Sequence, residues 1–523
     1  MSKKDLKERQ RERQIKQQKS EEAQQKRKEA DAKKNPKPLP KKKIFLAIAL
    51  IVIVLGVVLV WQFGIKTFTP VYIRSDGTVD PSAAAISNLD NSRYTFTADI
   101  FGLLVVERDN VVIDGANHLL YGEVDTNSTG IELDGRSNVT ITNLRVNDFK
   151  YGVFVKSGSN IVLSKNDLTN EYGIGFDSCS NNTVTENAIS DCYGAILLAQ
   201  SSNNQVTKNN LDNNNYSLNL DYGSSANIVS GNVITNGGEA IFVSKSSNNN
   251  SVSENSLENN GDGIMLDQCL NNTVVGNTIT NCEGAIGLTY ASDNRIIDND
   301  IIGGQYGIVI TLNSESNTVY GNNIRNGEAA IKFAYSSNNN NIFDNIIEAN
   351  TEGITLDDSS GNSIIGNTIT DCDGAIGLIY ATNNMITGNN ITYNQYSINV
   401  ISESNLNTIS ENDIKNSAVA IGISYSLYNQ VTGNNIVDNE FGVYLNASSD
   451  NSFSNNSFLN NTNQVFSLGS PNTWNTENAG NFWSDYQEKY PDAVILAQSG
   501  TWNTPYTIDE NNRDNYPLVN PET

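Results

Sequence analysis

The sequence predicts an all-β parallel β-helix, a solenoid with turns of about 22 residues, and three observations point to that fold. An Asn recurs at intervals of 21 to 23 residues from Asn143 to Asn456, as in a chain that repeats one unit per turn. Each unit contains short alternating apolar runs, such as NTVVGNTI at 272–279, which have the period of strands and are too short for helices. No Pro occurs between Ser82 and Ser470, as a continuous hydrogen-bonded ladder of strands requires.

The alternation also predicts which side chains fill the interior. Strands of successive turns stack about 4.8 Å apart, so residues at equivalent positions form columns along the axis. We expect Val274, Ile279, Ile286 and Leu288 to point inward in one such turn. We expect the recurring Asn, represented by Asn277, to turn a corner and to join a ladder of side-chain hydrogen bonds.

Three segments outside the strict repeat carry a family resemblance. They are DNVVIDGANHLL (109–120), GNFWSDY (480–486) and TPYTIDENNRDNYPL (504–518). With the repeat, they make the chain resemble the NosD-like parallel β-helix repeat proteins of archaeal surfaces. The resemblance implies a right-handed helix over 94–470, with about 15 regular turns after one or two irregular ones, and a C-terminal cap over 471–523. It assigns no function, because that fold carries lyases, hydrolases, adhesins and maturation factors.

The resemblance also raises copper delivery as a function, and the residues present argue against it. Soft ligands would have to come from His118, Met265, Met385 and five Cys, which are scattered along the chain. We expect the Cys to be free and buried, because Cys372 remains where its partner position has become Ser359. We therefore expect no metal and no cofactor.

The first 65 residues predict a membrane anchor with a basic tail. Residues 1–43 contain 17 Lys and Arg against 7 Asp and Glu, and the apolar run at 44–65 is long enough to span a bilayer. The positive-inside rule puts the tail in the cytoplasm and the β-helix outside, in a single-pass protein of the cell membrane. An uncleaved anchor is favoured over a signal peptide, because the basic segment is long and no A-x-A site follows. Residues 66–93 are expected to form a stalk.

The charge of the remaining chain limits its partners. Beyond residue 43 there are 17 basic and 51 acidic residues, a net charge of −34. Such a surface repels polyanions, so we expect no nucleic acid to bind. Cations, a basic surface, and neutral or basic glycans stay compatible with it.

The sequence also repeats over a longer period than the single turn. CYGAI, CEGAI and CDGAI begin at 192, 282 and 372, and Tyr216, Tyr306 and Tyr396 are also 90 residues apart. Ninety residues make four turns, so a four-turn block has been duplicated. This modular lengthening is typical of a spacer or of an extended binding surface.

One column of tyrosines is the best candidate for a ligand site. The fourth residue after the Ile of the [GA]-I motif is Tyr at 222, and from Tyr290 onward it is Tyr at every second turn, at Tyr290, Tyr335, Tyr380 and Tyr425. Two turns are about 10 Å along the axis, and Tyr rings offer stacking faces with a polar tip. We interpret the column, Tyr222 included, as ligand-binding positions for a polysaccharide or an envelope glycan; the alternative is that the rings wedge into the corner as packing.

An enzyme is the competing hypothesis, and its catalytic residues cannot be named from the sequence. Glu239 and Asp262 share a column on adjacent turns, as paired carboxylates of a hydrolase would. Asp221, Lys245 and Asp267 on three successive turns imitate the acids and base of a lyase. Chance pairs are expected in a chain so rich in Asp.

The leading hypothesis is therefore a membrane-anchored, extracytoplasmic β-helix that binds glycan or envelope components without catalysis. The alternatives are a carbohydrate-active lyase or hydrolase of polysaccharides, and a passive surface spacer or adhesin.

Overall fold

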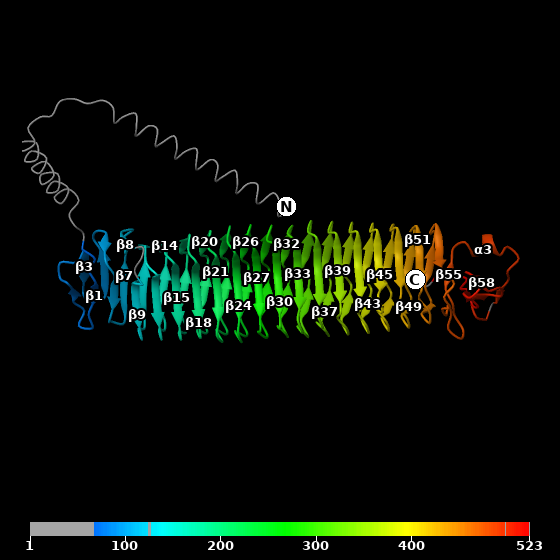
Figure 1. Ribbon diagram of the computed structural model, residues 1–523, viewed down its shortest axis with the longest axis horizontal. Coiled ribbons are helices and arrows are strands. Elements are labelled where there is room, and N and C mark those ends of the chain that lie inside the picture. The colour runs from blue at the N-terminus through cyan, green and yellow to red at the C-terminus, as the bar shows by residue number, and fades with distance from the viewer. Residues whose placement is uncertain (1–66, 124–126, 497, 522–523) are drawn as a thin grey trace, which may run out of the picture. The chain divides into compact units, whose positions relative to one another are not determined.

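The computed structural model describes residues 67–123, 127–496 and 498–521, which form a right-handed parallel β-solenoid of about 18 turns (Figure 1). The expected cytoplasmic tail (1–43) and transmembrane anchor (44–65) lie outside the described residues. Among the residues that are described, no helix is both long and apolar enough to cross a membrane.

Each turn contributes one strand to each of three parallel sheets, which we call A, B and C. In a typical turn, β28 (Thr273–Val275) lies in sheet B, β29 (Thr278–Thr280) in sheet C and β30 (Gly284–Thr289) in sheet A. The short strands of sheet B continue to β52 (Ser452–Ser454), and those of sheet C to β53 (Ser457–Leu459).

Sheet A has the longest strands, and each one from β9 to β51 has six residues. Its regular strands are β9 (Thr129–Asp134), β12 (Tyr151–Lys156), β15 (Tyr172–Asp177), β18 (Gly194–Ala199), β21 (Tyr216–Asp221), β24 (Glu239–Ser244), β27 (Asp262–Asp267), β30, β33 (Tyr306–Thr311), β36 (Ala329–Ala334), β39 (Glu352–Asp357), β42 (Gly374–Ile379), β45 (Tyr396–Ile401), β48 (Val419–Ser424), β51 (Phe441–Asn446) and β54 (Asn463–Ser467). Positions two, three and five of each six-residue strand are buried, and positions one, four and six face outward, as β21 illustrates. Neighbouring strands pair in register, so each outward position forms a column along the axis.

The interior is the one that the alternation predicts. Val274, Ile279, Ile286 and Leu288 are all at most 1% exposed. They belong to one continuous apolar core that follows the axis of the solenoid. Each inward residue stacks on its counterparts one turn before and one turn after, because the strands pair without a shift.

The predicted Asn ladder exists, and it stabilises one corner of the coil. Asn277 Nδ2 and its backbone N–H both donate to Asn299 Oδ1 at 3.0 Å, and Nδ2 also donates to Val252 O at 3.0 Å. A second ladder, one corner earlier in each turn, was not singled out from the sequence. In it, Asn272 donates to Asn294 in the same way.

The N-terminal boundary differs from the expected one. The stalk predicted at 66–93 is replaced by the first coil: β1 (Val71–Ile73) pairs in parallel with β6 (Leu104–Val106). A hairpin of β3 (Ile86–Leu89) and β4 (Arg93–Phe96) joins sheet B through β7 (Val111–Asp114). The repeat signature is lost there because the hairpin runs antiparallel, although alternating apolar residues still fill the core.

The C-terminal residues cover the open end of the core with stacked rings. Trp474 stacks on Phe453 at 4.2 Å between centroids, and Trp483 stacks on Phe458 at 4.5 Å. Trp483 lies on β55 (Phe482–Trp483), which is followed by the short helix α3 (Tyr486–Lys489). Asp514 is fully buried beneath these rings and accepts the Trp483 indole N–H at 3.0 Å. Burial raises the pKa of Asp514 to about 6.

Candidate functional site

The predicted tyrosines occupy the corner at which each sheet A strand ends. The residue after the strand turns the chain with a positive φ, and Tyr222, Tyr290, Tyr335, Tyr380 and Tyr425 have φ values between 49° and 53°. The five side chains are exposed, by 58%, 49%, 64%, 57% and 63% respectively. They are therefore not buried in the core.

Four of these rings form an evenly spaced line. Tyr290, Tyr335, Tyr380 and Tyr425 follow β30, β36, β42 and β48, which are alternate strands paired in register. Successive rings are thus about 10 Å apart along the axis. None of the four makes a ring contact with another aromatic side chain in the described part of the chain.

Tyr222 stands apart from this line. It lies three turns before Tyr290 instead of two. The ammonium of Lys245, one turn on, lies 4.1 Å from the centre of its ring. One face of Tyr222 is therefore covered by a cation, whereas no cation of the described residues lies over the four later rings.

The backbone conformation at this corner is costly for Tyr. A left-handed φ is uncommon outside Gly, Asn and Asp, and for a bulky residue it costs on the order of 1–3 kcal/mol. Other corners of the coil use residues that tolerate it, such as Gly276 and Asn281. Lys208 and Tyr393 also adopt this conformation at other corners, so the strain alone does not single out the tyrosine column.

The paired carboxylates of the enzyme hypothesis lie on the outer face of sheet A. Glu239 on β24 and Asp262 on β27 are register partners. Burial raises the pKa of both groups, and a neighbouring carboxylate adds to the shift: Asp262 for Glu239, and Glu283 for Asp262. This row of acids holds protons more tightly than ordinary surface carboxyls do.

The second set of candidate catalytic residues is held by internal contacts. Lys245 Nζ forms an ion pair with Asp221 Oδ2 at 2.8 Å, and Ser244 Oγ donates to Asp221 Oδ1 at 2.9 Å. Burial raises the pKa of Asp267, with the charge of Lys245 acting in the opposite direction. Lys245 is thus engaged by Asp221 and by the Tyr222 ring, and is not available as a free base.

Soft metal ligands are not brought together. His118 Nδ1 lies 3.5 Å from Asp99 Oδ1 in an early turn, while Met265 and Met385 lie in different sheets. The five Cys are free and buried, as expected, and burial raises the pKa of the Cys192 thiol to about 11. Within the described residues no three His, Cys, Asp or Glu side chains are grouped to hold a metal ion. The residues do not fit a copper site.

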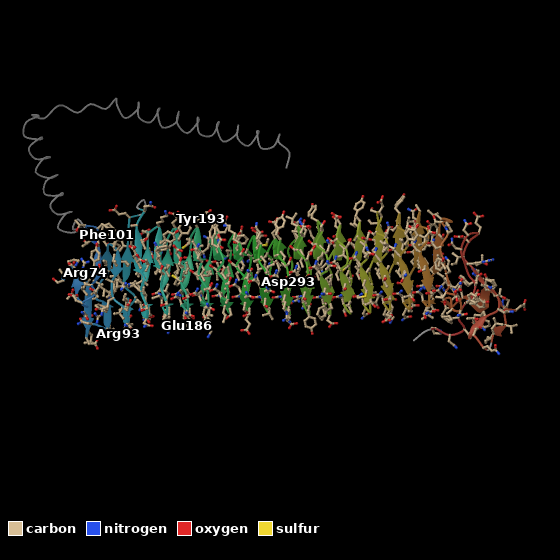
Figure 2. The ribbon with its side chains drawn as sticks, turned by 90° about the horizontal axis from the view of Figure 1, so that it is seen from below. Arg74, Arg93, Phe101, Glu186, Tyr193 and Asp293 are labelled. Atoms are coloured by element: carbon tan, nitrogen blue, oxygen red, sulfur yellow. The ribbon has the colours of Figure 1, made fainter. Side chains whose placement is uncertain are left out.

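An aromatic ladder on sheet A was missed from the sequence. Tyr151, Tyr172, Tyr193 and Tyr216 lie on four successive turns, with ring centroids 4.9, 5.7 and 5.4 Å apart. Tyr193 projects outward from the coil (Figure 2). The signal was present as a Tyr near the start of each strand at intervals of 21 to 23 residues. The next turn after Tyr216 begins the row of acids at Glu239.

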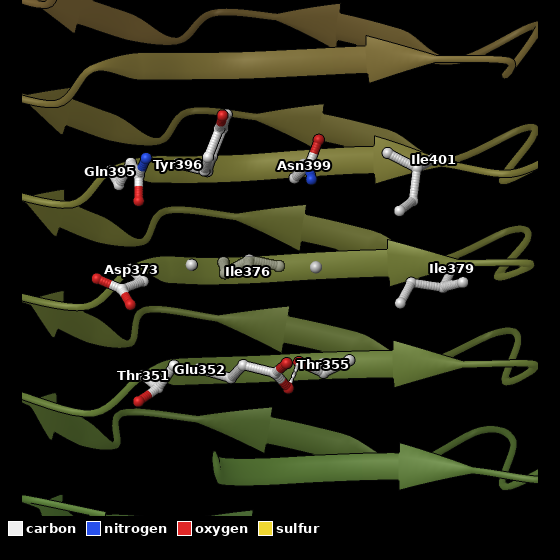
Figure 3. Close-up of a pocket in the computed structure, with 12 residues that line it drawn as sticks. Thr351, Glu352, Thr355, Asp373, Ile376, Ile379, Gln395, Tyr396, Asn399 and Ile401 are labelled. Carbon is white, nitrogen blue, oxygen red and sulfur yellow. Dashed lines mark hydrogen bonds between the residues drawn. The ribbon is translucent and has the colours of Figure 1, made fainter. Parts of the chain in front are cut away.

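A groove also crosses the outer face of sheet A, and the sequence did not predict it. One hollow of about 280 Å³ lies over β39, β42 and β45 (Figure 3). A second hollow of about 400 Å³ lies over β33, β36 and β39. Thr351 and Glu352 line both hollows, so the two are adjacent, and we refer to them together as the groove. Glu239 and Asp262 line neither hollow.

Comparison with solved structures finds distant likenesses. One is a double mutant of the periplasmic alginate epimerase AlgG, with 15% identity and a TM-score of 0.42 over 54% of this chain and 80% of that one. Another is DFA-IIIase from Arthrobacter chlorophenolicus A6 in complex with DFA-III, with 11% identity and a TM-score of 0.35 over 50% and 84%. A third is an alginate lyase from Paenibacillus sp. str. FPU-7, with 10% identity and a TM-score of 0.28 over 46% and 88%. Likenesses this distant assign no activity.

Comparison with family models is more specific. The model described as periplasmic copper-binding protein (NosD) matches residues 215–334, 306–418 and 333–488. The model described as right handed beta helix region matches residues 129–268. A search of curated proteins found no match. Because the overlapping NosD matches span more than half of the chain, and the coil has the matching architecture, the protein belongs to the NosD family of right-handed β-helix proteins.

Proposed function

We propose that this protein binds a polysaccharide or another envelope glycan without transforming it, through the line formed by Tyr290, Tyr335, Tyr380 and Tyr425. The observation that carries the proposal is the exposure of four equivalent rings, between 49% and 64%, at alternate turns on one edge of sheet A. A rigid solenoid holds these rings at constant spacing, so one extended ligand reaches several of them at once.

The energetics favour an extended ligand. A single ring stacked on a sugar contributes on the order of 1 kcal/mol, which gives no useful affinity alone. Rings on one scaffold act at a high effective concentration once the first is engaged, so affinity grows with the number of rings reached. The acidic surface further favours a neutral or basic glycan over an acidic one.

The membrane anchor and the extracytoplasmic location belong to the same proposal. They rest on the basic composition of residues 1–43 and the apolar run at 44–65. Protease added to intact cells should degrade the β-helix and spare the tail. Protection of the β-helix with loss of the tail would contradict this topology.

The glycan proposal is tested by removing all four rings together. The variant carries Asn in place of the four tyrosines, because Asn tolerates the left-handed corner. Tyr393→Asn is the matched control, since Tyr393 is 65% exposed with φ 59° but stands at a different corner. On an array of immobilised glycans, the wild type and the control should bind the same long glycan, and the quadruple variant should bind it much more weakly. Undiminished binding by the quadruple variant would contradict the glycan proposal and favour the spacer hypothesis.

The raised pKa values of Glu239 and Asp262 favour one second candidate, a polysaccharide lyase or hydrolase. A general acid needs a carboxyl that stays protonated near its working pH, and burial shifts the pKa of both groups in that direction. Incubation with the glycan found on the array should release no new reducing ends. If the wild type releases reducing ends and the Glu239→Gln variant does not, the protein is an enzyme and the binding proposal is wrong.

A further inference from the structure

A tyrosine lies at each end of the groove on sheet A, and the two tyrosines are equivalent residues of successive four-turn blocks. Tyr306 lines the hollow at one end and Tyr396 lines the hollow at the other. They are the first residues of β33 and β45, four turns apart, which corresponds to about 19 Å along the axis. The groove is therefore long enough for an oligosaccharide, and an aromatic ring bounds each end.

The floor of the groove is open at Gly377, where the side chain of the preceding turn differs between the duplicated blocks. On β42, a Cβ added to Gly374 would meet nothing within 4 Å, and one added to Gly377 would come no closer than 3.8 Å to Thr355. Ninety residues earlier, the equivalent Gly287 is covered: a Cβ there would lie 2.5 Å from Met265 Cε. Thr355 stands where the earlier block has Met265, so the hollow is filled in one block and open in the next.

The walls of the groove carry polar groups that are available to a ligand. Thr355 Oγ1 donates to Glu352 Oε2 at 3.1 Å and so orients that carboxylate (Figure 3). The side-chain amides of Gln395 and Asn399 make no hydrogen bond to any described residue. Lys332 likewise makes no ion pair within the described part of the chain. Sugar hydroxyls both donate and accept hydrogen bonds, which this mixture of amide, carboxylate and ammonium groups satisfies.

The other surfaces of the groove suit the apolar faces of sugar rings. Gly374 and Gly377 leave a flat backbone floor, and Ile379 and Ile401 form an apolar shelf along one side. Tyr396 is 42% exposed and lines the groove. Stacking of a sugar face on such a ring is the same type of contact that we propose for the tyrosine line.

Other classes of ligand fit the groove less well. A peptide that adds a strand needs a free sheet edge, but β39 and β42 already pair with strands on both sides. Nucleic acids and polyuronates are anionic, and the groove is lined by Glu328, Glu352 and Asp373 against one Lys. A neutral oligosaccharide meets neither objection.

We propose that the sheet A groove between Tyr306 and Tyr396 is a second saccharide site that binds a neutral oligosaccharide along the axis of the solenoid. It goes beyond the tyrosine line, because it uses different side chains on the face of the sheet. Substitutions in one site should weaken saccharide binding at that site and leave binding at the other site unchanged.

The experiment measures binding of cellotetraose and chitotetraose to the full chain by titration calorimetry. Thr355→Met should weaken binding of the preferred tetrasaccharide at least tenfold, because the new side chain fills the hollow as Met265 does one block earlier. Thr280→Met makes the same chemical change on sheet C and should leave the affinity unchanged. The quadruple Tyr→Asn variant should still bind the tetrasaccharide in the groove.

Three results with the wild type or Thr355→Met would overturn the assignment. They are wild-type affinity in Thr355→Met, equal affinity of the wild type for tetragalacturonate, and no binding of either neutral tetrasaccharide at millimolar concentration. Should Thr355→Met fail to fold, Tyr396→Ala serves as the second variant, with the same expected loss. Loss of tetrasaccharide binding in the quadruple variant would also overturn the groove, while supporting the tyrosine line.

Discussion

Replacing Asn277 with Ala removes one rung from an Asn ladder and leaves its neighbours in place. Asn277 Oδ1 accepts the backbone N–H and the Nδ2 group of Asn255, each at 2.9 Å. Asn255 Nδ2 keeps a second acceptor, Val229 O, at 3.0 Å. The Asn255 backbone N–H has no second acceptor among the described residues, and both Asn side chains are buried.

The magnitude follows from these contacts. One buried donor left without a partner costs about 1–3 kcal/mol, and the bonds from Asn277 Nδ2 to Val252 O and Asn299 Oδ1 contribute about 1 kcal/mol each. We therefore expect Asn277→Ala to lower the free energy of unfolding by about 3–5 kcal/mol. Asn341→Ala, at an exposed position of β37 (Asn341–Phe343), is the matched control and should change it by less than about 0.5 kcal/mol.

The assay combines guanidinium unfolding, followed by circular dichroism, with native-state hydrogen exchange. Exchange is needed because each solenoid turn contacts only its neighbours, so the array need not unfold in one step. The Asn255 amide should lose protection in Asn277→Ala and keep it in the control. Equal unfolding midpoints for the two variants, or an Asn255 amide that stays protected, would refute the ladder as a source of stability.

Other substitutions test the interior, the tyrosine corner and the cap. Ile286→Asp should lower the free energy of unfolding by several kcal/mol, because it buries a carboxylate without a partner. Its yield of folded protein should fall below that of the control Thr278→Asp, which changes an exposed residue. Equal yields would contradict the inward position of Ile286. Tyr335→Asn should raise the melting temperature, with a gain of about 1 kcal/mol from relief of the left-handed strain, and a lower melting temperature would contradict that strain. Burial raises the pKa of Asp514 from 3.8 to about 6, so the folded cap binds this proton more tightly than the unfolded chain does. The contribution of Asp514 to stability is therefore greatest below about pH 4, falls as the pH rises to about 6, and is constant above. Tryptophan fluorescence of the cap should follow this slope, Asp514→Asn should flatten it, and a slope of opposite sign would contradict the assignment.

The repeat made most of the fold predictable. A period of 21 to 23 residues, with alternation inside each turn, placed Ile286 and Leu288 in the core and Asn277 in a ladder. The second ladder through Asn272 was missed, although the same motif contains that Asn. The first coil was also missed, because β3 and β4 form an antiparallel hairpin that does not show the repeat.

The site was predictable only where it follows the period. The tyrosine corner could be found because one residue type recurs at one position of alternate turns. The groove could not, since it depends on which side chain overlies a Gly one turn away: Met265 covers Gly287, whereas Thr355 leaves Gly377 open. That difference is a matter of side-chain length between stacked strands, which a period does not reveal.

The most direct test of the proposed function is the dependence of affinity on the length of the glycan. Oligosaccharides of increasing length, cut from the glycan that the array identifies, are titrated against the wild type and the quadruple Tyr→Asn variant. Affinity for the wild type should rise steeply once the ligand spans two rings, about 10 Å, and rise again as a third ring is reached. The quadruple variant should show no such steps. A disaccharide that binds as tightly as an octasaccharide, or steps that persist without the four rings, would contradict the proposal that the tyrosine line holds the glycan.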